Sequence, residues 1–420
     1  MSSTIIEKIL ARAAGLERVS PDDVVTCDVD MTILIDVQFA MSRLDDVVAV
    51  HDPAKVAIVM DHAVPAPTVR DATHGVKARA FATKHGIERF YDVGRHGIVH
   101  QVVAEQGLAL PGSVVACTDS HTCAAGAVNS AARGLGPAEI LQMVCTGKTW
   151  HRVPPTIKYV LTGTKPAHIN GKDIFLAIAG TFGDATDHAI EFGGPGLSSV
   201  PMTDRRTIAT QGAEVGADFT VFPADDVCLE YMSTTAPEAQ FTPQNADEDA
   251  EYAAVREINL DLIEPMVASP GTVINNARPV SELTGVAIDQ AFIGSCANGQ
   301  LADLRVAADV MRGNTVAPGV RLIVTPASQQ VYLDAVKLGY VTTLVESGAV
   351  VTNSTCGACF GYHMGVLAPG EVCITASTRN FRGRMGSAEA SVYMASPATV
   401  AASAIIGRIA SVQELEPVTS

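Results

Sequence analysis

The sequence predicts an α/β protein whose sheets are mostly parallel. Short apolar runs that end at Gly, Asp or Asn alternate along the chain with segments of helical periodicity. This alternation is typical of parallel sheets covered by helices. The clearest predicted strands lie within residues 55–60, 113–118, 286–294, 320–326 and 371–376.

Three helices are predicted from the residues at their ends. Near the N-terminus, Thr4 and Glu7 have the spacing of a capping box, and Gly15 has the position of a helix stop. Residues 137–146 begin with a proline in the first turn and are followed by a glycine. A third helix is expected over residues 301–311.

The 420 residues are enough for three domains of ordinary size. Residues 151–156 contain two prolines and mark a weak boundary. Residues 234–258 are polar and acidic, and they have the composition of a surface linker. We therefore expect domains over residues 1–153, 154–269 and 270–420.

Charge and apolarity argue against two kinds of partner. The formal net charge is −16, whereas a nucleic-acid partner requires a basic face. The most apolar stretch, residues 392–409, is broken by Pro397, so we expect no membrane-spanning helix.

The N-terminus lacks the basic and apolar regions of a signal peptide. We therefore expect a cytoplasmic protein whose cysteines are reduced.

Three cysteines lie in glycine-rich loops that follow predicted strands. Cys356 and Cys359 form a C-x-x-C motif in NSTCGACFGYHMG, and Cys296 lies in IGSCANG. Ligands of parallel α/β sheets bind at the carboxyl ends of the strands, where free N–H groups favour anionic sulfur. The pattern alone leaves open an iron–sulfur cluster, a zinc site with His363 as a fourth ligand, or inert core thiols. The remaining cysteines, which we expect to be core thiols, are Cys27, Cys117, Cys123, Cys145, Cys228 and Cys373.

Four longer stretches carry a resemblance to a known family. They are ACTDSHTCAAGAV (116–128), VCTGKTWHRVPPTIKYVLTG (144–163), FIGSCANGQLADLRVAA (292–308) and CGACFGYHMGVLAPGEVCITASTRNFRGRMGS (356–387). In this order they resemble the aconitase superfamily of iron–sulfur hydro-lyases. More narrowly, they resemble large subunits of isopropylmalate isomerase and their homoaconitase relatives.

The resemblance implies three aconitase-like α/β domains around a central cluster cleft. By the same resemblance, Cys296, Cys356 and Cys359 hold three irons of one 4Fe–4S cluster. The labile fourth iron has no protein ligand, so it is available to the substrate as a Lewis acid.

The resemblance also implies the residues of an acid–base system. An Asp–His pair after the strand at 55–60 would protonate the departing hydroxyl, because a carboxylate raises the basicity of an imidazole. The residues alone fit equally well a turn at the end of a strand with a solvated histidine. The glutamate in HAIEFGGPG matches the family's cleft glutamate, although alone it reads as a solvated loop carboxylate. The predicted catalytic residues are Asp61, His62, His100, Asp119, His121 and Glu191.

Arginines in the segment TRNFRGR are predicted to bind the substrate. Arg379 and Arg384 would pair bidentately with carboxylates, which explains how an acidic protein binds a dicarboxylate. Arg382, between them, is expected to face solvent. Ser120 and Asn298 complete the predicted substrate contacts.

The implied reaction is isomerisation of a hydroxy-dicarboxylate or hydroxy-tricarboxylate by dehydration and rehydration. The expected substrate is 3-isopropylmalate, in leucine biosynthesis; homoaconitase and methylmalate or dimethylmalate substrates are the alternatives. Ile35 stands where relatives often carry a polar residue beside Asp36, which leaves the subsite for the variable group open. An iron or redox sensor that binds nucleic acid is the competing class, and the acidic balance disfavours it.

Nothing in the chain matches the swivelling fourth domain that supplies the serine base in single-chain aconitases. We therefore expect a separate small subunit, in a heterodimer or heterotetramer, and no activity from this chain alone.

Overall fold

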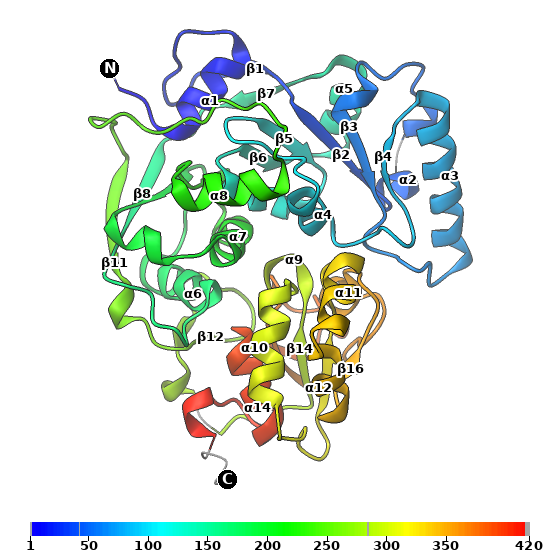
Figure 1. The fold of residues 1–420 in the computed structure, drawn as a ribbon, viewed down its shortest axis with the longest axis vertical. Coiled ribbons are helices and arrows are strands. Elements are labelled where there is room, and N and C mark those ends of the chain that lie inside the picture. The colour runs from blue at the N-terminus through cyan, green and yellow to red at the C-terminus, as the bar shows by residue number, and fades with distance from the viewer. Residues whose placement is uncertain (1, 42, 284, 416–420) are drawn as a thin grey trace. The chain divides into compact units, whose positions relative to one another are not determined.

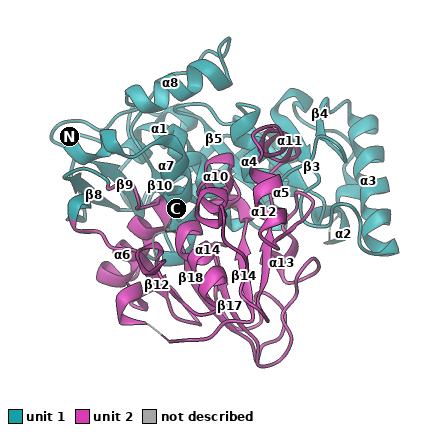
Figure 2. Cartoon of the chain, turned by 60° about the horizontal axis from the view of Figure 1, so that its bottom comes forward, with its two compact units in different colours: residues 1–165, 185–261 teal, residues 166–184, 262–420 magenta. Residues whose placement is uncertain are grey.

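The computed structural model describes residues 2–41, 43–283 and 285–415 (Figure 1). Contacts divide the chain into two compact units (Figure 2). Unit 1 comprises residues 1–165 and 185–261, and unit 2 comprises residues 166–184 and 262–420. The division into three domains stays a prediction.

Unit 1 contains a parallel five-stranded sheet of order β4-β3-β2-β5-β6. The predicted strands at 55–60 and 113–118 are confirmed as β3 and β5. Helix α3 lies along the edge of this sheet, beside β4 (Figure 1). The strands are β2 (Met31–Ile35), β3 (Val56–Val59), β4 (Arg89–Tyr91), β5 (Val114–Cys117) and β6 (Ala131–Gly134). The helices of this part are α1 (Ile5–Ala14), α2 (Gln38–Met41), α3 (Val69–His85), α4 (Val99–Glu105) and α5 (Pro137–Thr146).

The end signals of two helices in unit 1 act as predicted. Thr4 and Glu7 form the capping box of α1, and Gly15 ends the helix in a left-handed conformation with φ of 68°. Helix α5 spans the predicted residues and is ended by Gly147 at φ of 71°.

A second parallel sheet of unit 1 has the order β10-β9-β8-β11. Its strands are β8 (Thr156–Thr162), β9 (Ala189–Gly193), β10 (Phe219–Val221) and β11 (Ala254–Asn259). Helices α7 (Met202–Gln211) and α8 (Asp226–Thr235) accompany it, and an antiparallel ribbon pairs β1 (Val24–Asp28) with β7 (Lys148–Arg152).

The prediction of a linker over residues 234–258 is wrong at both ends. Residues 234 and 235 are the last turn of α8, and residues 254–258 belong to β11, which pairs with β8 along its whole length. The polar composition is explained by the position of β11 at the sheet edge, where alternate side chains face solvent. The preceding segment is also anchored, since Asp247 accepts a hydrogen bond from the Ser3 N–H at 2.8 Å.

Unit 2 is built on a seven-stranded sheet of order β13-β12-β18-β17-β14-β15-β16, in which β18 to β16 are parallel. The predicted strands at 286–294, 320–326 and 371–376 are confirmed as β14, β15 and β17. The strands are β12 (Met266–Ala268), β13 (Ala277–Pro279), β14 (Gln290–Ile293), β15 (Arg321–Val324), β16 (Val350–Val351), β17 (Val372–Thr375) and β18 (Ser391–Ala395).

The helices of unit 2 cover this sheet and enclose an aliphatic core. The predicted helix over residues 301–311 is confirmed as α10. The helices are α6 (Gly171–Phe182), α9 (Ser295–Asn298), α10 (Leu301–Met311), α11 (Gln329–Lys337), α12 (Tyr340–Glu346), α13 (Gly357–Phe360) and α14 (Pro397–Ile406).

Five of the six cysteines expected in the core are buried, and Cys145 is not. Helix α5 turns Ile140, Met143 and Val144 into the core, which leaves Cys145 on its solvent side. Among the described residues, no helix is both long and apolar enough to cross a membrane.

Candidate active site

Three carboxylates of unit 1 follow three neighbouring parallel strands. Asp36 follows β2, Asp61 follows β3 and Asp119 follows β5. These strands are adjacent in the sheet, so their carboxyl ends share one edge. That edge is where parallel α/β sheets bind ligands.

The Asp61–His62 pair is held in place from several directions. His62 Nδ1 is hydrogen-bonded to the Asp61 carboxylate. The other Asp61 oxygen accepts the Val99 N–H at 3.2 Å, and Asp36 accepts the His62 N–H at 3.2 Å. His62 Nε2 lies 3.9 Å from Asp119 Oδ2. The Asp–His pair is therefore a buried, oriented group rather than a solvated turn.

Asp119 joins two further histidines. Its Oδ1 atom lies 2.8 Å from His100 Nε2, accepts the His121 N–H at 2.8 Å, and lies 3.4 Å from His121 Nδ1. His100 is on α4, and His121 is in the 3-10 helix η3 (Ser120–Val128). The structure thus brings together five of the six predicted catalytic residues in unit 1.

The histidine group has one member that the sequence analysis missed. Glu214 Oε1 lies 2.8 Å from His121 Nε2. Glu214 sits in the short 3-10 helix η5 (Gly212–Val215), and a Cβ atom at Gly212 would lie 1.8 Å from Thr220 Oγ1. A glutamate between Gly212 and Gly216, in a turn that requires glycine, was the available signal.

Burial and hydrogen bonding push the pKa values of two carboxyls in this group apart. Burial raises the pKa of Asp61 to about 7, although His62 opposes the shift. Burial also acts to raise the pKa of Asp119, but hydrogen bonds from His100 and His121 outweigh it and hold that pKa well below its usual range. Burial lowers the pKa of His100. A group with separated pKa values can hold a proton at one carboxyl while the other stays ionised.

Glu191 lies in β9, and its described contacts are with residues outside the histidine group. It is 2% exposed; its two carboxylate oxygens accept the Ile5 N–H at 2.9 Å and the Tyr252 O–H at 2.5 Å. Lys158 Nζ lies 3.5 Å away. This geometry supports a structural role, because Glu191 caps the first turn of α1. Its catalytic role stays a prediction.

The three predicted cluster cysteines all lie in unit 2, at the carboxyl edge of its parallel strands. Cys296 is buried in the first turn of α9, directly after β14. Cys356 and Cys359 lie in and beside the short helix α13, which follows β16. Cys359 Sγ lies 3.7 Å from Thr378 Oγ1 and 3.9 Å from Arg384 Nη2.

The surroundings of these thiols offer polar groups to a bound cofactor. Three buried oxygens near the thiols have no hydrogen-bond partner among the described residues, and they can pair with a bound group. These oxygens belong to Asn298, Ser354 and Ser377.

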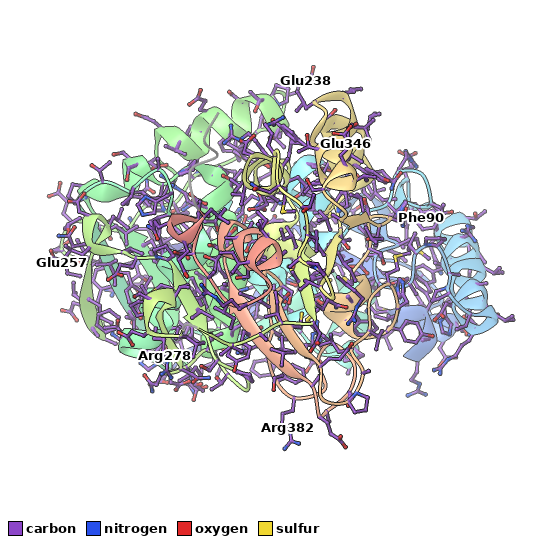
Figure 3. All side chains as sticks on the ribbon, turned by 90° about the horizontal axis from the view of Figure 1, so that it is seen from below. Phe90, Glu238, Glu257, Arg278, Glu346 and Arg382 are labelled. Carbon is purple, nitrogen blue, oxygen red and sulfur yellow. The ribbon has the colours of Figure 1, made fainter. Side chains whose placement is uncertain are left out.

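The substrate loop that follows β17 is anchored by a buried lysine, a second residue that the sequence analysis missed. Lys172 is 0% exposed, and its Nζ donates to the Ser377 carbonyl at 2.9 Å. Arg379 and Arg384 are half-buried in this loop. Arg382 is exposed, as predicted, and projects from the ribbon (Figure 3).

The two remaining predicted substrate contacts lie in different units. Ser120 is an exposed residue at the start of η3 in unit 1. Asn298, in unit 2, is buried and donates to Asp303 Oδ1 at 3.0 Å and to Asn170 Oδ1 at 3.3 Å. Their roles toward a substrate stay predictions.

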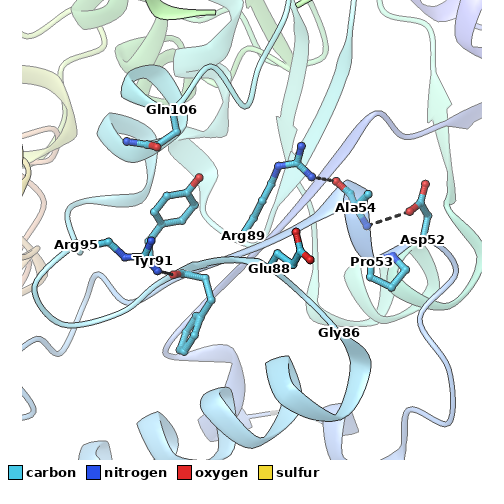
Figure 4. A pocket seen from close by; sticks show the side chains of 10 residues that line it. Asp52, Pro53, Ala54, Gly86, Glu88, Arg89, Tyr91, Arg95 and Gln106 are labelled. Atoms are coloured by element: carbon cyan, nitrogen blue, oxygen red, sulfur yellow. Dashed lines mark hydrogen bonds between the residues drawn. The ribbon is translucent and has the colours of Figure 1, made fainter.

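A surface cavity of about 730 Å³ lies away from these groups, beside strand β4 (Figure 4). Arg89, Tyr91, Arg95 and Gln106 are among the residues that line it, and none of the predicted site residues does so. We therefore place the candidate site at the strand ends and not in this cavity.

Comparison with known proteins gives a consistent set of relatives. The model of the aconitase family (aconitate hydratase) matches residues 13–282 and 271–407. A 3-isopropylmalate dehydratase large subunit of Mycolicibacterium smegmatis is 63% identical over 409 residues, which cover 97% of this chain and 96% of that protein. Large subunits of the same name from Caldanaerobacter subterraneus and Methanopyrus kandleri are each 43% identical, over 99% and 97% of this chain and 100% and 98% of theirs.

Proposed function

Because the chain belongs to the aconitase family, we propose that it is the large subunit of a 3-isopropylmalate dehydratase, a hydro-lyase of leucine biosynthesis. The superfamily and the narrower resemblance predicted from the sequence are confirmed. The single observation that supports 3-isopropylmalate as the substrate is the 63% identity to a large subunit of this name along almost the whole chain.

An iron–sulfur cluster is the cofactor that the family implies, and the thiols of unit 2 fit it. Cys296, Cys356 and Cys359 would hold three irons of a 4Fe–4S cluster. When bound, this cluster supplies a Lewis acid, its labile fourth iron, for a substrate hydroxyl and carboxylate. Asn298 and Ser377 offer buried polar groups beside the thiols.

The arginines of the substrate loop bind and orient the substrate. Arg379 and Arg384 pair with its carboxylates, since guanidinium forks match carboxylates bidentately. Lys172 fixes the Ser377 carbonyl two residues before Arg379, so the loop keeps its shape without substrate. Orientation by fixed groups is a large part of the rate enhancement in such a reaction.

The histidines and carboxylates of unit 1 carry out the proton transfers to and from the substrate hydroxyl. His62, oriented by Asp61, protonates the hydroxyl that departs during dehydration, with His100 as the second imidazole. Asp119 stays ionised and holds His100 and His121 in orientation. The reverse transfers serve rehydration.

A separate small subunit completes the enzyme. The relatives are named large subunits, which supports a partner of this kind. The partner supplies the serine base that removes the carbon-bound proton, in a heterodimer or heterotetramer. The cytoplasmic location stays a prediction.

The test is an activity assay of the assembled complex. The chain, prepared without oxygen, is mixed with its small subunit, and formation of the unsaturated acid is followed by ultraviolet absorbance. We expect kcat/KM for 3-isopropylmalate to exceed that for homoisocitrate and dimethylmalate by about tenfold or more, the scale of a few buried methyl groups. A cluster-loaded complex that acts on none of these acids would contradict the proposed function.

A further inference from the structure

We propose that an exposed aromatic patch of unit 2 is the surface on which the small subunit docks. The patch consists of Phe360, Tyr362, Val366 and Phe381. The inference rests on the proposed function for the identity of the partner, and it adds the location and chemistry of the contact.

The four side chains are unusually exposed for their type. Phe360 is 37% exposed, and Tyr362, Val366 and Phe381 are each 44% exposed. The Phe360 and Tyr362 rings meet edge to face with centroids 6.1 Å apart. The Arg384 guanidinium carbon lies 6.0 Å from the Phe360 centroid and 5.8 Å from that of Phe381, so it joins the two rings. The three aromatic side chains therefore form one patch rather than scattered exposed residues. Val366 belongs to the same loop as Tyr362 and lies beside Gly386, two residues after Arg384.

The backbone beneath the patch is closely packed. A Cβ atom at Gly361 would lie 2.4 Å from the Arg384 carbonyl oxygen, and one at Gly386 would lie 2.7 Å from Val366 Cγ1. Leu367 and Gly386 form a parallel bridge between the two segments. A firmly supported patch binds a partner without the entropic cost of ordering a loop.

The patch is continuous with the cysteines that would hold the cluster. Phe360 directly follows Cys359, and Arg384 Nη2 lies 3.9 Å from Cys359 Sγ. Cys356 is only half-buried in this chain. The chemistry of such a site favours exclusion of water, and a small subunit seated on the patch would help to exclude it.

The composition of the patch favours a protein partner over a small ligand. Aromatic residues and arginine are enriched at the centres of protein interfaces and supply most of their binding energy. The isopropyl group of one substrate cannot cover four large side chains. Arg382, exposed beside the patch, donates to the Ala388 carbonyl and has no ion pair among the described residues. We therefore expect an apolar face on the small subunit with a carboxylate opposite Arg382.

The test measures the affinity of the small subunit for patch variants of the cluster-loaded chain. Tyr362→Ala and Phe381→Ala are each expected to raise Kd about tenfold or more, as for aromatic residues at the centre of an interface. Tyr362→Phe keeps the ring and is expected to bind nearly as wild type does. Arg382→Glu should slow association and make it less sensitive to salt.

Two exposed side chains on α11 provide the matched control. Leu333 and Val336 are 48% and 50% exposed and lie outside the patch. Leu333→Ala and Val336→Ala should leave Kd unchanged. Iron content and thermal unfolding of every variant show whether weaker binding reflects loss of the cluster or of the fold.

The outcomes separate this inference from the proposed function. Wild-type affinity in the Tyr362→Ala, Phe381→Ala double variant, with the cluster intact, would overturn the docking surface while an active wild-type complex preserved the function. If the patch variants lose self-association but keep their affinity for the small subunit, the patch binds a second copy of this chain. That result would also overturn the docking surface. An inactive wild-type complex in which the patch variants still weaken assembly would instead contradict the function.

Discussion

Replacement of Glu191 tests whether this residue supports the fold or the chemistry. Glu191→Ala removes the acceptor of the buried Ile5 N–H and of the Tyr252 O–H. An unsatisfied buried donor costs about 1–3 kcal/mol, and this cost applies to the Ile5 N–H, whereas the half-buried Tyr252 hydroxyl can turn to water. We therefore expect a loss of about 1–3 kcal/mol in the free energy of unfolding. For a unit of this size, about 2 kcal/mol corresponds to a fall in Tm of about 4–8 °C.

The assay is thermal unfolding of the chain, combined with kcat/KM of the assembled complex. Glu191→Gln keeps one acceptor oxygen, so it should lose less stability than the alanine variant and keep kcat/KM within about threefold of wild type. Glu257→Ala, an exposed position on β11, is the control and should change stability by less than about 0.5 kcal/mol.

A Glu191→Ala variant with wild-type Tm and a large fall in kcat would contradict a structural role for this residue. That outcome would return Glu191 to the catalytic role predicted from the sequence. It would also mean that the contact between β9 and the first turn of α1 contributes little to stability.

Three further predictions concern buried or half-buried polar groups. Glu214→Gln should lower kcat about 10–100-fold with little change in KM, because the charge that orients His121 is lost; an unchanged pH profile of kcat would contradict this. Lys172→Met should raise KM more than it lowers kcat, since the Ser377 carbonyl loses its donor; equal effects on both would contradict it. Because the pKa of Asp61 is raised to about 7 in the folded chain, the folded state binds the Asp61 proton more tightly than the unfolded state does. The stabilisation from this proton is present near pH 4 and is lost as pH rises to about 7. Asp61→Asn should therefore flatten the fall in Tm over that range, and an unchanged slope would count against the burial argument.

Most strands and helices were predictable because their signals are local. The capping box of α1, the proline and glycine at the ends of α5, and the apolar runs of β3 and β14 each depend on residues close together in the chain. Polar composition misled the prediction for residues 254–258, because an edge strand with one solvent face resembles a linker in sequence.

The site was predictable where its chemistry follows a strand end. Cys296, Asp61 and Asp119 each stand directly after an apolar run, at a position that topology makes a ligand edge. Glu214 and Lys172 were missed because each acts through a partner 93 or 205 residues away along the chain. The glycines on either side of Glu214 are a weak local signal, and no local pattern distinguishes Lys172 from a solvated surface charge.

Three thiols of this chain are proposed to hold a cluster with one iron free of protein ligands. The direct measurement is iron and acid-labile sulfide per chain, prepared without oxygen, with EPR spectra before and after mild oxidation. We expect about four irons and four sulfides per chain, and a three-iron EPR signal after oxidation. Cys296→Ser should lose this cluster, and Cys228→Ser, at a buried thiol of unit 1, should keep it. One zinc per folded chain, or full iron in Cys296→Ser, would contradict the claim.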